Sequence, residues 1–184
     1  DDAIQSHFPL GYKGYAVELG ALDGVYLSNT LKLEGLGWTC LCIEPNQIHH
    51  EALKANRKLV MTCACSDYNG KADLYRNQTV PHLTQTAIYP DTGFAWEKQG
   101  EVEVKTLDQC LIEAGFPKLD AVSIDVDGIE LKILVGLNVG KWRPKVIIVE
   151  ENAAGGPIAE LLSDYTRGPQ MCHDHIYVLK EPTP

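Results

Sequence analysis

The chain of 184 residues carries a formal net charge of -9, from 16 basic and 25 acidic side chains, and 45% of its residues are hydrophobic. This acidic balance disfavours a nucleic-acid partner, because such proteins present basic faces to phosphates. No apolar run reaches the ~20 residues of a membrane-spanning helix, and the first residues lack the basic and apolar segments of a signal peptide. We therefore expect one domain over residues 1–184, located in the cytoplasm.

Short apolar runs alternate with helical patterns along most of the chain. The runs predict strands, and the patterns between them predict helices. Strands are expected at Tyr15–Leu19, Trp38–Ile43, Val60–Ala64, Asp120–Ile124 and Lys145–Val149, and helices at Leu27–Leu36, Gln47–Arg57 and Ile129–Val135. Strands that are apolar on both faces are typical of parallel sheets covered by helices on either side. The alternation predicts an α/β fold with a doubly wound, mostly parallel sheet, whose ligands bind beyond the carboxyl ends of the strands.

Residues 71–106 interrupt this alternation. Lys71–Arg76 and Glu101–Lys105 alternate like strands, with a segment rich in Pro and Thr between them. An irregular segment of roughly 25 residues inside a compact domain is usually functional or mobile. We predict a hairpin-like insertion, which either covers the active site or forms a solvated excursion on the surface.

The segment Glu18-Leu-Gly-Ala-Leu-Asp-Gly24 follows the first predicted strand. Glycines at such a turn allow positive φ and a close approach of a ligand to the backbone, and the N-terminus of the next helix suits an anionic group. The triple-glycine spacing of a dinucleotide turn is absent, because position 22 is Leu. A ligand that carries both an amine and a carboxylate fits this turn, and a purely structural turn is the alternative.

Polar residues also follow the second and third predicted strands. Glu44 stands about 20 residues after the glycine turn, where a carboxylate accepts hydrogen bonds from both ribose hydroxyls of an adenosine ligand. Ser66 or Asp67 is expected near an adenine amino group, and a simple loop turn at Asp67 is the alternative. These positions indicate an adenosine ligand without choosing between a nicotinamide and a sulfonium cofactor.

Three carboxylates, Asp125, Asp127 and Glu130, follow the fourth predicted strand. Such a group is costly unless it is solvated, paired or bound to a cation. Asp127 and Glu130 match a helix capping box, whereas Asp125 is expected to face the cleft as a general base or a cation ligand. Together with Glu151 and Asn152, Asp125 forms an all-oxygen set suited to Mg²⁺ or Ca²⁺.

Cysteines and histidines offer further chemistry. Two Cys-x-Cys pairs, Cys40/Cys42 and Cys63/Cys65, lie in strand-like runs where residues i and i+2 share a face. Core packing is expected for them, with a metal site or a disulfide as the alternative. The candidate general bases among the histidines are His82, His173 and His175.

Six of these segments, in the same order, resemble the FkbM family of S-adenosylmethionine-dependent methyltransferases. The two most specific are Gly37-Trp-Thr-Cys-Leu-Cys-Ile-Glu-Pro-Asn46 and Ile124-Asp-Val-Asp-Gly-Ile-Glu130. The other four are Glu18–Glu34, Ala64–Asp67, Val104–Asp108 and Arg143–Glu150. The resemblance implies a Rossmann-like methyltransferase fold, S-adenosylmethionine as cofactor, and methyl transfer to a hydroxyl of a small molecule or sugar.

The resemblance also implies roles for particular residues. Gly20 and its neighbours would hold the methionine part, Glu44 the ribose, and Ser66 or Asp67 the adenine. Asp125 and Glu130 are the catalytic candidates. The full set expected to bind cofactor is Glu18, Gly20, Ala21, Asp23, Gly24, Ser28, Glu44, Pro45, Ser66, Asp67 and Asp125.

Two departures from the family pattern stand out. The usual Asp-x-Glu-Gly motif has Asp at position 127, one methylene shorter than Glu. The segment Asp164–Glu181 is short for the usual final pair of strands, and only Ile176–Leu179 has a clear strand pattern. The sequence pattern therefore defines one strand at this edge of the sheet and does not define its outer neighbour.

Two other functions fit part of the sequence. A nicotinamide-dependent oxidoreductase would share the carboxylate at Glu44 but needs the triple-glycine turn that this chain lacks. A non-catalytic domain that binds a cofactor or a partner would keep the same fold, because function resides in the site rather than in the fold.

Overall fold

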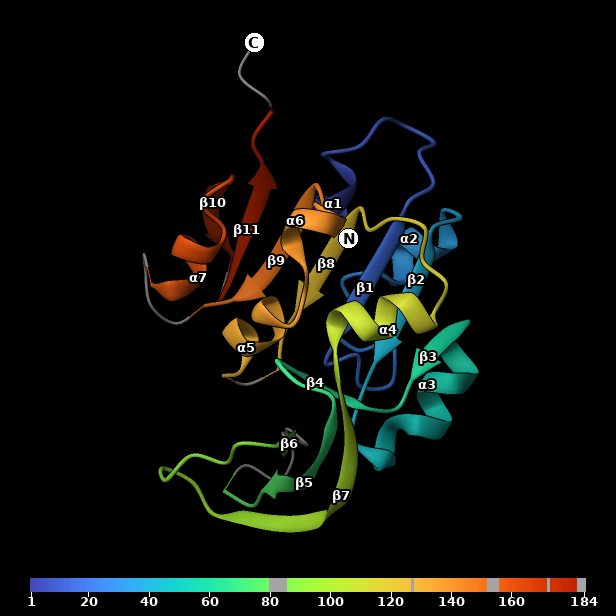
Figure 1. The fold of residues 1–184 in the computed structure, drawn as a ribbon. Helices are drawn as coiled ribbons and strands as arrows, with labels where there is room; N and C mark the ends of the chain where they lie inside the picture. Colours follow the sequence, from blue (N-terminus) through green and yellow to red (C-terminus); the bar gives the residue numbers. More distant parts are fainter. Residues whose placement is uncertain (80–85, 127, 152–155, 172, 182–184) are drawn as a thin grey trace.

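The computed structural model describes residues 1–79, 86–126, 128–151, 156–171 and 173–181. A seven-stranded sheet forms its centre, in the order β10-β11-β9-β8-β1-β2-β3 (Figure 1). The strands of this main sheet are β1 (Tyr15–Leu19), β2 (Thr39–Ile43), β3 (Leu59–Met61), β8 (Ala121–Ile124), β9 (Val146–Glu150), β10 (Tyr165–Met171) and β11 (Asp174–Leu179).

The topology of the main sheet creates a place for a ligand. All neighbouring strands from β3 to β9 are parallel, and β11 is antiparallel to both of its neighbours. The chain runs outward from β1 through β2 to β3 and then returns to β8 on the other side of β1. Strand order therefore reverses between β1 and β8, and ligands of doubly wound sheets bind at this switch point. The predicted mostly parallel α/β fold is confirmed.

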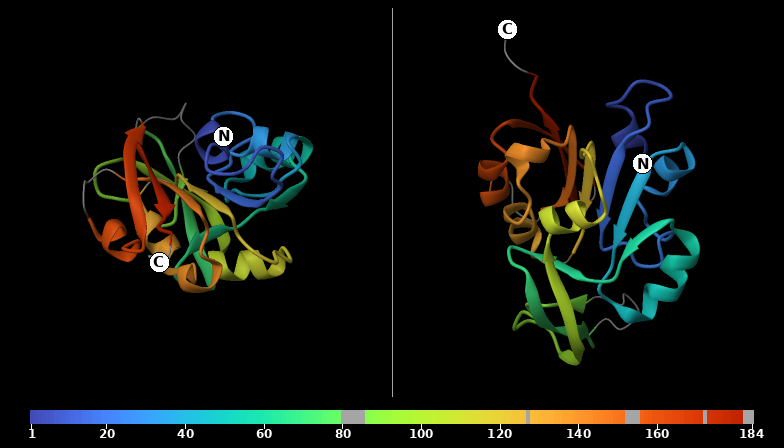
Figure 2. Two further views of the ribbon diagram at one scale, coloured as in Figure 1. Left: turned by 90° about the horizontal axis from the view of Figure 1, so that it is seen from above. Right: turned by 45° about the vertical axis from the view of Figure 1, so that its right-hand side comes forward.

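Helices cover both faces of the main sheet (Figures 1 and 2). Alternate strand residues point to opposite faces, and Val17 and Ala16 accordingly belong to two different core clusters. The helices are α1 (Asp2–Gln5), α2 (Leu31–Gly35), η1 (Gln47–His49), α3 (His50–Asn56), α4 (Leu107–Glu113), α5 (Glu130–Val135), α6 (Val139–Trp142) and α7 (Pro157–Leu161). Residues of α4, α5 and α7 share the cluster of Val17, and residues of α1 and α2 share that of Ala16. Across the described part of the chain, every helix is too short or too polar to span a bilayer.

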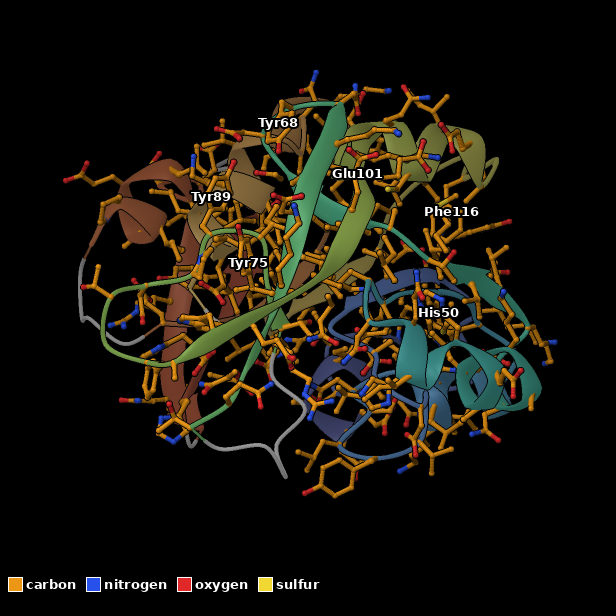
Figure 3. The ribbon with its side chains drawn as sticks, turned by 90° about the horizontal axis from the view of Figure 1, so that it is seen from below. His50, Tyr68, Tyr75, Tyr89, Glu101 and Phe116 are labelled. Carbon is orange, nitrogen blue, oxygen red and sulfur yellow. The ribbon has the colours of Figure 1, made fainter. Side chains whose placement is uncertain are left out.

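A second sheet of four strands lies at the carboxyl-end edge of the main sheet (Figure 1). Its strands, in the order β4-β7-β5-β6, are β4 (Ala64–Ser66), β5 (Gly70–Asn77), β6 (Thr86–Ala87) and β7 (Trp96–Thr106). Strands β5 and β7 pair antiparallel, as the hairpin-like prediction requires. The Lys132 ammonium of α5 lies 4.9 Å from the centre of the Tyr89 ring, and Tyr89 lies near Tyr68 on this side of the molecule (Figure 3). These contacts attach the second sheet to the body of the domain.

The sequence prediction is wrong for the first helix and for the third strand. Helix α2 starts only at Leu31, because Leu27 adopts a left-handed backbone with φ of 55° and the preceding turn extends into a loop. The predicted strand Val60–Ala64 is two strands: β3 stays in the main sheet, whereas β4 leaves it and pairs with β7. A continuous apolar run does not show that the chain changes sheets within it.

The C-terminal edge of the main sheet has two strands, whereas the sequence pattern defined only Ile176–Leu179. Strands β10 and β11 form an antiparallel pair beside β9. Strand β10 lacks an alternating apolar pattern because it contains Arg167, Gly168 and Pro169, and its register shifts between Arg167 and Gln170. An edge strand tolerates such residues, since one of its sides needs no partner.

Candidate functional site

A cavity of about 320 Å³ lies at the switch point, between the main sheet and the second sheet. The ends of β1, β2 and β8 supply one wall, and the segments around β4, β5 and β6 supply the other. The lining residues include Gly20, Leu22, Leu27, Glu44, Pro45, Cys63, Ala64, Cys65, Leu74, Thr86, Ala87, Ile88, Asp125 and Val126. Of the two alternatives for the insertion, the structure supports the one in which it covers the site.

Gly20 allows the ends of β1 and β8 to meet closely. Its φ is +75°, and a Cβ at this position would lie 2.0 Å from the backbone oxygen of Asp125. The N–H groups of Gly20 and Ala21 donate to the Ile43 carbonyl at 3.1 and 3.2 Å. Three strand ends are thus tied together by backbone contacts that no larger residue at position 20 permits.

Two leucines of the cavity wall have strained backbones. Leu22 and Leu27 adopt left-handed conformations, with φ of 47° and 55°, and both line the cavity. This conformation costs roughly 1–2 kcal/mol for an L-residue with a side chain. Such strain concentrates at functional sites, where the surrounding structure holds it in place.

Glu44 is a buried carboxylate in the wall of the cavity, with 3% of its surface exposed. Its Oε2 accepts a hydrogen bond from the N–H of Leu22 at 3.0 Å, and its Oε1 accepts one from the N–H of Asn46 at 2.8 Å. The ring of His50 (Figure 3) lies 2.9 Å from the Glu44 carbonyl oxygen. The two N–H donors fix the carboxylate in the cavity wall.

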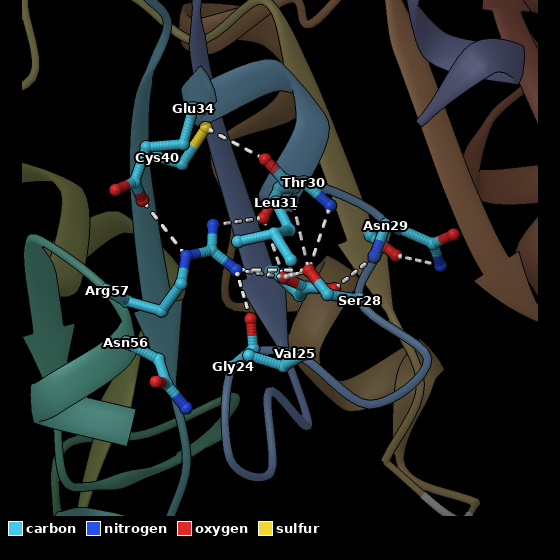
Figure 4. A network of polar contacts seen from close by, with 12 residues as sticks. Gly24, Val25, Ser28, Asn29, Thr30, Leu31, Glu34, Cys40, Asn56 and Arg57 are labelled. Atoms are coloured by element: carbon cyan, nitrogen blue, oxygen red, sulfur yellow. Dashed lines mark hydrogen bonds and ion pairs between the residues drawn. The ribbon is translucent and has the colours of Figure 1, made fainter. Parts of the chain in front are cut away.

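Arg57 organises a buried polar network behind the cavity (Figure 4). Its guanidinium contacts Glu18 Oε2 at 3.2 Å, Glu34 Oε2 at 3.0 Å and Thr30 Oγ1 at 2.7 Å. Ser28 Oγ donates to Glu18 Oε2 at 2.8 Å. Glu18 and Ser28, both expected to bind cofactor, do not line the cavity, and their hydrogen bonds instead hold the loop that leads to α2.

The other residues of the glycine turn also shape that loop. The carboxylate of Asp23 accepts the N–H groups of Tyr26 and Val25 at 2.8 and 2.9 Å, and these hydrogen bonds lower its pKa. Gly24 has φ of +80°, and a Cβ there would lie 2.4 Å from Cγ of Arg57. Like Ala21, neither of them lines the cavity. Of the residues predicted in this segment, only Gly20 reaches it.

Ser66 and Asp67 lie outside the cavity wall. Ser66 is fully buried and donates to Asp67 Oδ1 at 3.0 Å, and Asp67 also lies 3.5 Å from the Lys132 ammonium. Because the chain leaves the main sheet after Met61, the wall beside β2 is formed by the segment 63–65 instead. The structure therefore does not bring the two predicted adenine ligands to the other site residues.

Asp125 stands at the end of β8 and lines the cavity. Its side chain reaches solvent, yet the surrounding protein desolvates the carboxyl group and so raises its pKa. A hydrogen bond with Glu150 and the nearby His173 partly offset this rise. A carboxyl group with a raised pKa, paired with a second carboxyl at a strand end, is suited to proton transfer.

Glu130, the second catalytic candidate, does not line the cavity. It is buried, and its Oε1 accepts the N–H groups of Val126 and Gly128 at 3.3 and 2.9 Å. Glu130 thereby holds the loop that follows Asp125. Asp127, the other residue of the expected capping box, lies outside the described residues.

Glu151, one of the residues predicted to bind a cation, is held by other side chains. Glu151 Oε2 accepts a hydrogen bond from the Tyr177 hydroxyl at 2.8 Å and from Arg167 at 3.1 Å, with the ring of His175 at 3.7 Å. Asn152 lies outside the described residues, as does His82. Of the other two candidate bases, His175 is buried in this cluster, and His173 is exposed and close enough to influence Asp125.

The sequence did not predict a role for Arg57 or for the residues of β5 and β6. Arg57 ends the predicted helix, and its side chain is fully buried. One signal was present: Glu18 lies inside a strand that is otherwise apolar, and a buried carboxylate needs a partner. No comparable signal placed Leu74 or Ile88 in the cavity wall.

The strand order and the cavity at the switch point define a Rossmann-like α/β domain. The family model of the methyltransferase FkbM domain matches residues 18–176, so this chain belongs to the FkbM family. No curated protein sequence matches the chain significantly.

Two solved structures share the fold. Methyltransferase FkbM from Methylobacillus flagellatus KT superposes with a TM-score of 0.60 at 16% identity, over 90% of this chain and 43% of that one. The N-terminal domain of human METTL16, in complex with SAH, gives a TM-score of 0.51 at 13% identity, over 98% of this chain and 67% of that one. The present chain thus spans less than half the length of the Methylobacillus protein.

Proposed function

We propose that this chain is an S-adenosylmethionine-dependent methyltransferase that acts on a hydroxyl oxygen of a small molecule or sugar. The observation that carries the proposal is the switch-point cavity, in which Gly20, Glu44 and Asp125 stand at three adjacent strand ends. Membership of the FkbM family and the SAH bound in the METTL16 complex support the choice of cofactor.

The cavity residues fit an adenosine-containing cofactor. Glu44 is held by two backbone donors, so its carboxylate is preorganised to accept hydrogen bonds from ribose hydroxyls. The apolar side chains of Leu74 and Ile88 form a wall suited to an adenine ring. Gly20 lies in the cavity wall, on the side where the methionine part would lie.

Asp125 is proposed to act on the acceptor. When bound, the cofactor would supply a methyl group on a sulfonium for in-line transfer to an oxygen nucleophile, with S-adenosylhomocysteine as the leaving group. Asp125 would accept the hydroxyl proton of the acceptor during attack, and its raised pKa brings it closer to the value that suits a general base at neutral pH. Glu150 would share that proton through its hydrogen bond with Asp125. Because Glu151 is bound to Arg167 and Tyr177, we route no step through a cation at this place.

A nicotinamide-dependent oxidoreductase is less well supported. The side chain of Leu22 occupies the turn where a dinucleotide site needs glycine, and Leu22 is itself part of the cavity wall. A non-catalytic binding domain would need neither the raised pKa of Asp125 nor its pairing with Glu150.

The proposal is tested by incubating the chain with methyl-labelled S-adenosylmethionine and matched panels of alcohols, sugars and amines. Label in the alcohol or sugar products is expected. Transfer should be lost in Asp125→Asn and retained in Asp164→Asn, which changes an exposed aspartate that does not line the cavity. Transfer only to amines would contradict the choice of acceptor, and unchanged turnover in Asp125→Asn would contradict the role of that residue.

A further inference from the structure

Three buried cysteines meet beside the cavity. Cys63 and Cys65 come from the segment that enters β4, and Cys110 comes from α4. The Sγ atom of Cys110 lies 3.9 Å from that of Cys63 and 3.7 Å from that of Cys65, and all three Sγ atoms lie within 4.8 Å of one another. None of the three is in a disulfide. In the part of the chain that the structure describes, this is the one group of three or more potential metal ligands from His, Cys, Asp or Glu.

The separations of the sulfur atoms match those of a thiolate metal site. A Zn–S bond is about 2.3 Å long, and a tetrahedral angle then places two sulfur ligands about 3.8 Å apart. The separations of Cys110 Sγ from Cys63 Sγ and from Cys65 Sγ, 3.9 and 3.7 Å, lie on either side of this value. A cation can therefore bind all three sulfurs with small side-chain shifts and without moving β4 or α4.

The second Cys-x-Cys pair shows what an ordinary buried thiol looks like in this fold. Cys40 and Cys42 also share a face of one strand and are buried. The Sγ of Cys40 donates to the Thr30 carbonyl at 3.7 Å, and burial raises the pKa of both thiols to about 12. They belong to no group of three ligands among the described residues, so their spacing alone confers no metal site.

The cluster of three differs from that pair in geometry and in access. The thiolate is the form that binds metals, and all three sulfur atoms lie within 4.8 Å of one another, so that one ion can contact them together. Cys63 and Cys65 line the cavity, so an ion can reach the sulfurs from there.

We propose that Cys63, Cys65 and Cys110 form a three-thiolate site for a thiophilic cation, namely Zn²⁺ or its softer analogues Cd²⁺ and Cu⁺. Thiolate ligands select these ions over Mg²⁺ and Ca²⁺. On binding, each ligating thiol releases its proton to solvent, and the cavity side leaves room for a water as a fourth ligand of Zn²⁺. This site uses none of the oxygen ligands predicted near Asp125, and it does not depend on the proposed methyl transfer.

The test is a titration of the reduced chain with Cd²⁺, followed by the ultraviolet absorption of cadmium–thiolate bonds and by competition with a chelator. One ion per chain is expected, and X-ray absorption should find three sulfur neighbours. Cys110→Ser should weaken binding roughly 100-fold or more, since loss of even an outer-shell partner costs 10–100-fold. The matched control Cys40→Ser should bind as the unchanged chain does.

Two results would overturn the proposal. One is the absence of cadmium–thiolate absorption in the unchanged, reduced chain. The three cysteines would then be packed in the core without binding a metal. The other is equal affinity of the unchanged chain and the Cys110→Ser variant. Circular dichroism checks that the variant is folded, and Cys63→Ser supplies a second test if it is not.

Discussion

Replacement of Arg57 by Met tests whether the loop behind the cavity depends on one buried cation. The change keeps most of the side-chain length but removes the guanidinium, which contacts Glu18, Glu34, Ser28 and Thr30 in a fully buried position. Glu18 and Glu34 are only 4% and 7% exposed. Two carboxylates are then left in the interior without their cation.

The expected loss in the free energy of unfolding depends on which partners each carboxylate keeps in the variant. Removal of one partner of a buried ion pair costs about 3–5 kcal/mol. Glu18 keeps donors from Ser28 and Thr30, whereas Glu34 keeps only the exposed Lys58 at 3.8 Å. We therefore expect the loss of stability to come mainly from Glu34. The double variant Arg57→Met with Glu34→Gln should recover about 0.5–3 kcal/mol of the free energy of unfolding.

The assay is urea unfolding of the two variants and of a control, Lys58→Met. The Lys58 side chain is 79% exposed and its pair with Glu34 is long, so its removal should cost at most about 1 kcal/mol. A loss below about 1 kcal/mol for Arg57→Met, or no recovery in the double variant, would refute the account of the network.

Three further predictions concern the cavity. Glu44→Gln should weaken binding of S-adenosylhomocysteine roughly tenfold or more in calorimetry, since a hydrogen bond to a charged group contributes about 1.5–3 kcal/mol, while Glu51→Gln on the exposed face of α3 should not. In urea unfolding, Gly20→Ala should destabilise the chain by more than about 1 kcal/mol, because Gly20 has positive φ and a Cβ there would collide with the Asp125 oxygen. The control Gly35→Ala should be neutral or stabilising, since no atom lies near the position of its Cβ. Burial raises the pKa of Asp125 above 3.8, so the folded chain binds this proton more tightly than the unfolded chain, and stability falls as pH rises through that window. Asp125→Asn should accordingly raise the urea midpoint at neutral pH and give no gain in acid below the unfolded pKa.

The sequence predicted the main sheet well, because its strands are marked by local patterns. Strand β1 was predicted with the bounds found in the structure, and β2, β8 and β9 within one residue of them. Each of these strands is buried on both faces, so an unbroken apolar run identifies it. Because Gly20, Glu44 and Asp125 follow three of these strands, the sequence predicted that they lie at the same edge of the sheet.

The parts that could not be predicted depend on contacts between distant segments. Strand β4 continues the apolar run of β3, and only its pairing with β7, some 40 residues later, moves it into the second sheet. That pairing removes Ser66 from the cavity and places Cys65 in its wall. The meeting of Cys65 with Cys110 likewise has no local signal, because α4 carries a single cysteine.

The most direct test of the central claim is a calorimetric titration of the unchanged chain with S-adenosylhomocysteine, and separately with NADH. The cavity geometry predicts binding of one S-adenosylhomocysteine per chain, weakened in Glu44→Gln, and no binding of NADH because Leu22 stands where a dinucleotide turn needs glycine. Binding of NADH without binding of S-adenosylhomocysteine would contradict the proposed function. Equal affinity of the unchanged chain and Glu44→Gln for S-adenosylhomocysteine would show that the ligand does not bind at this cavity.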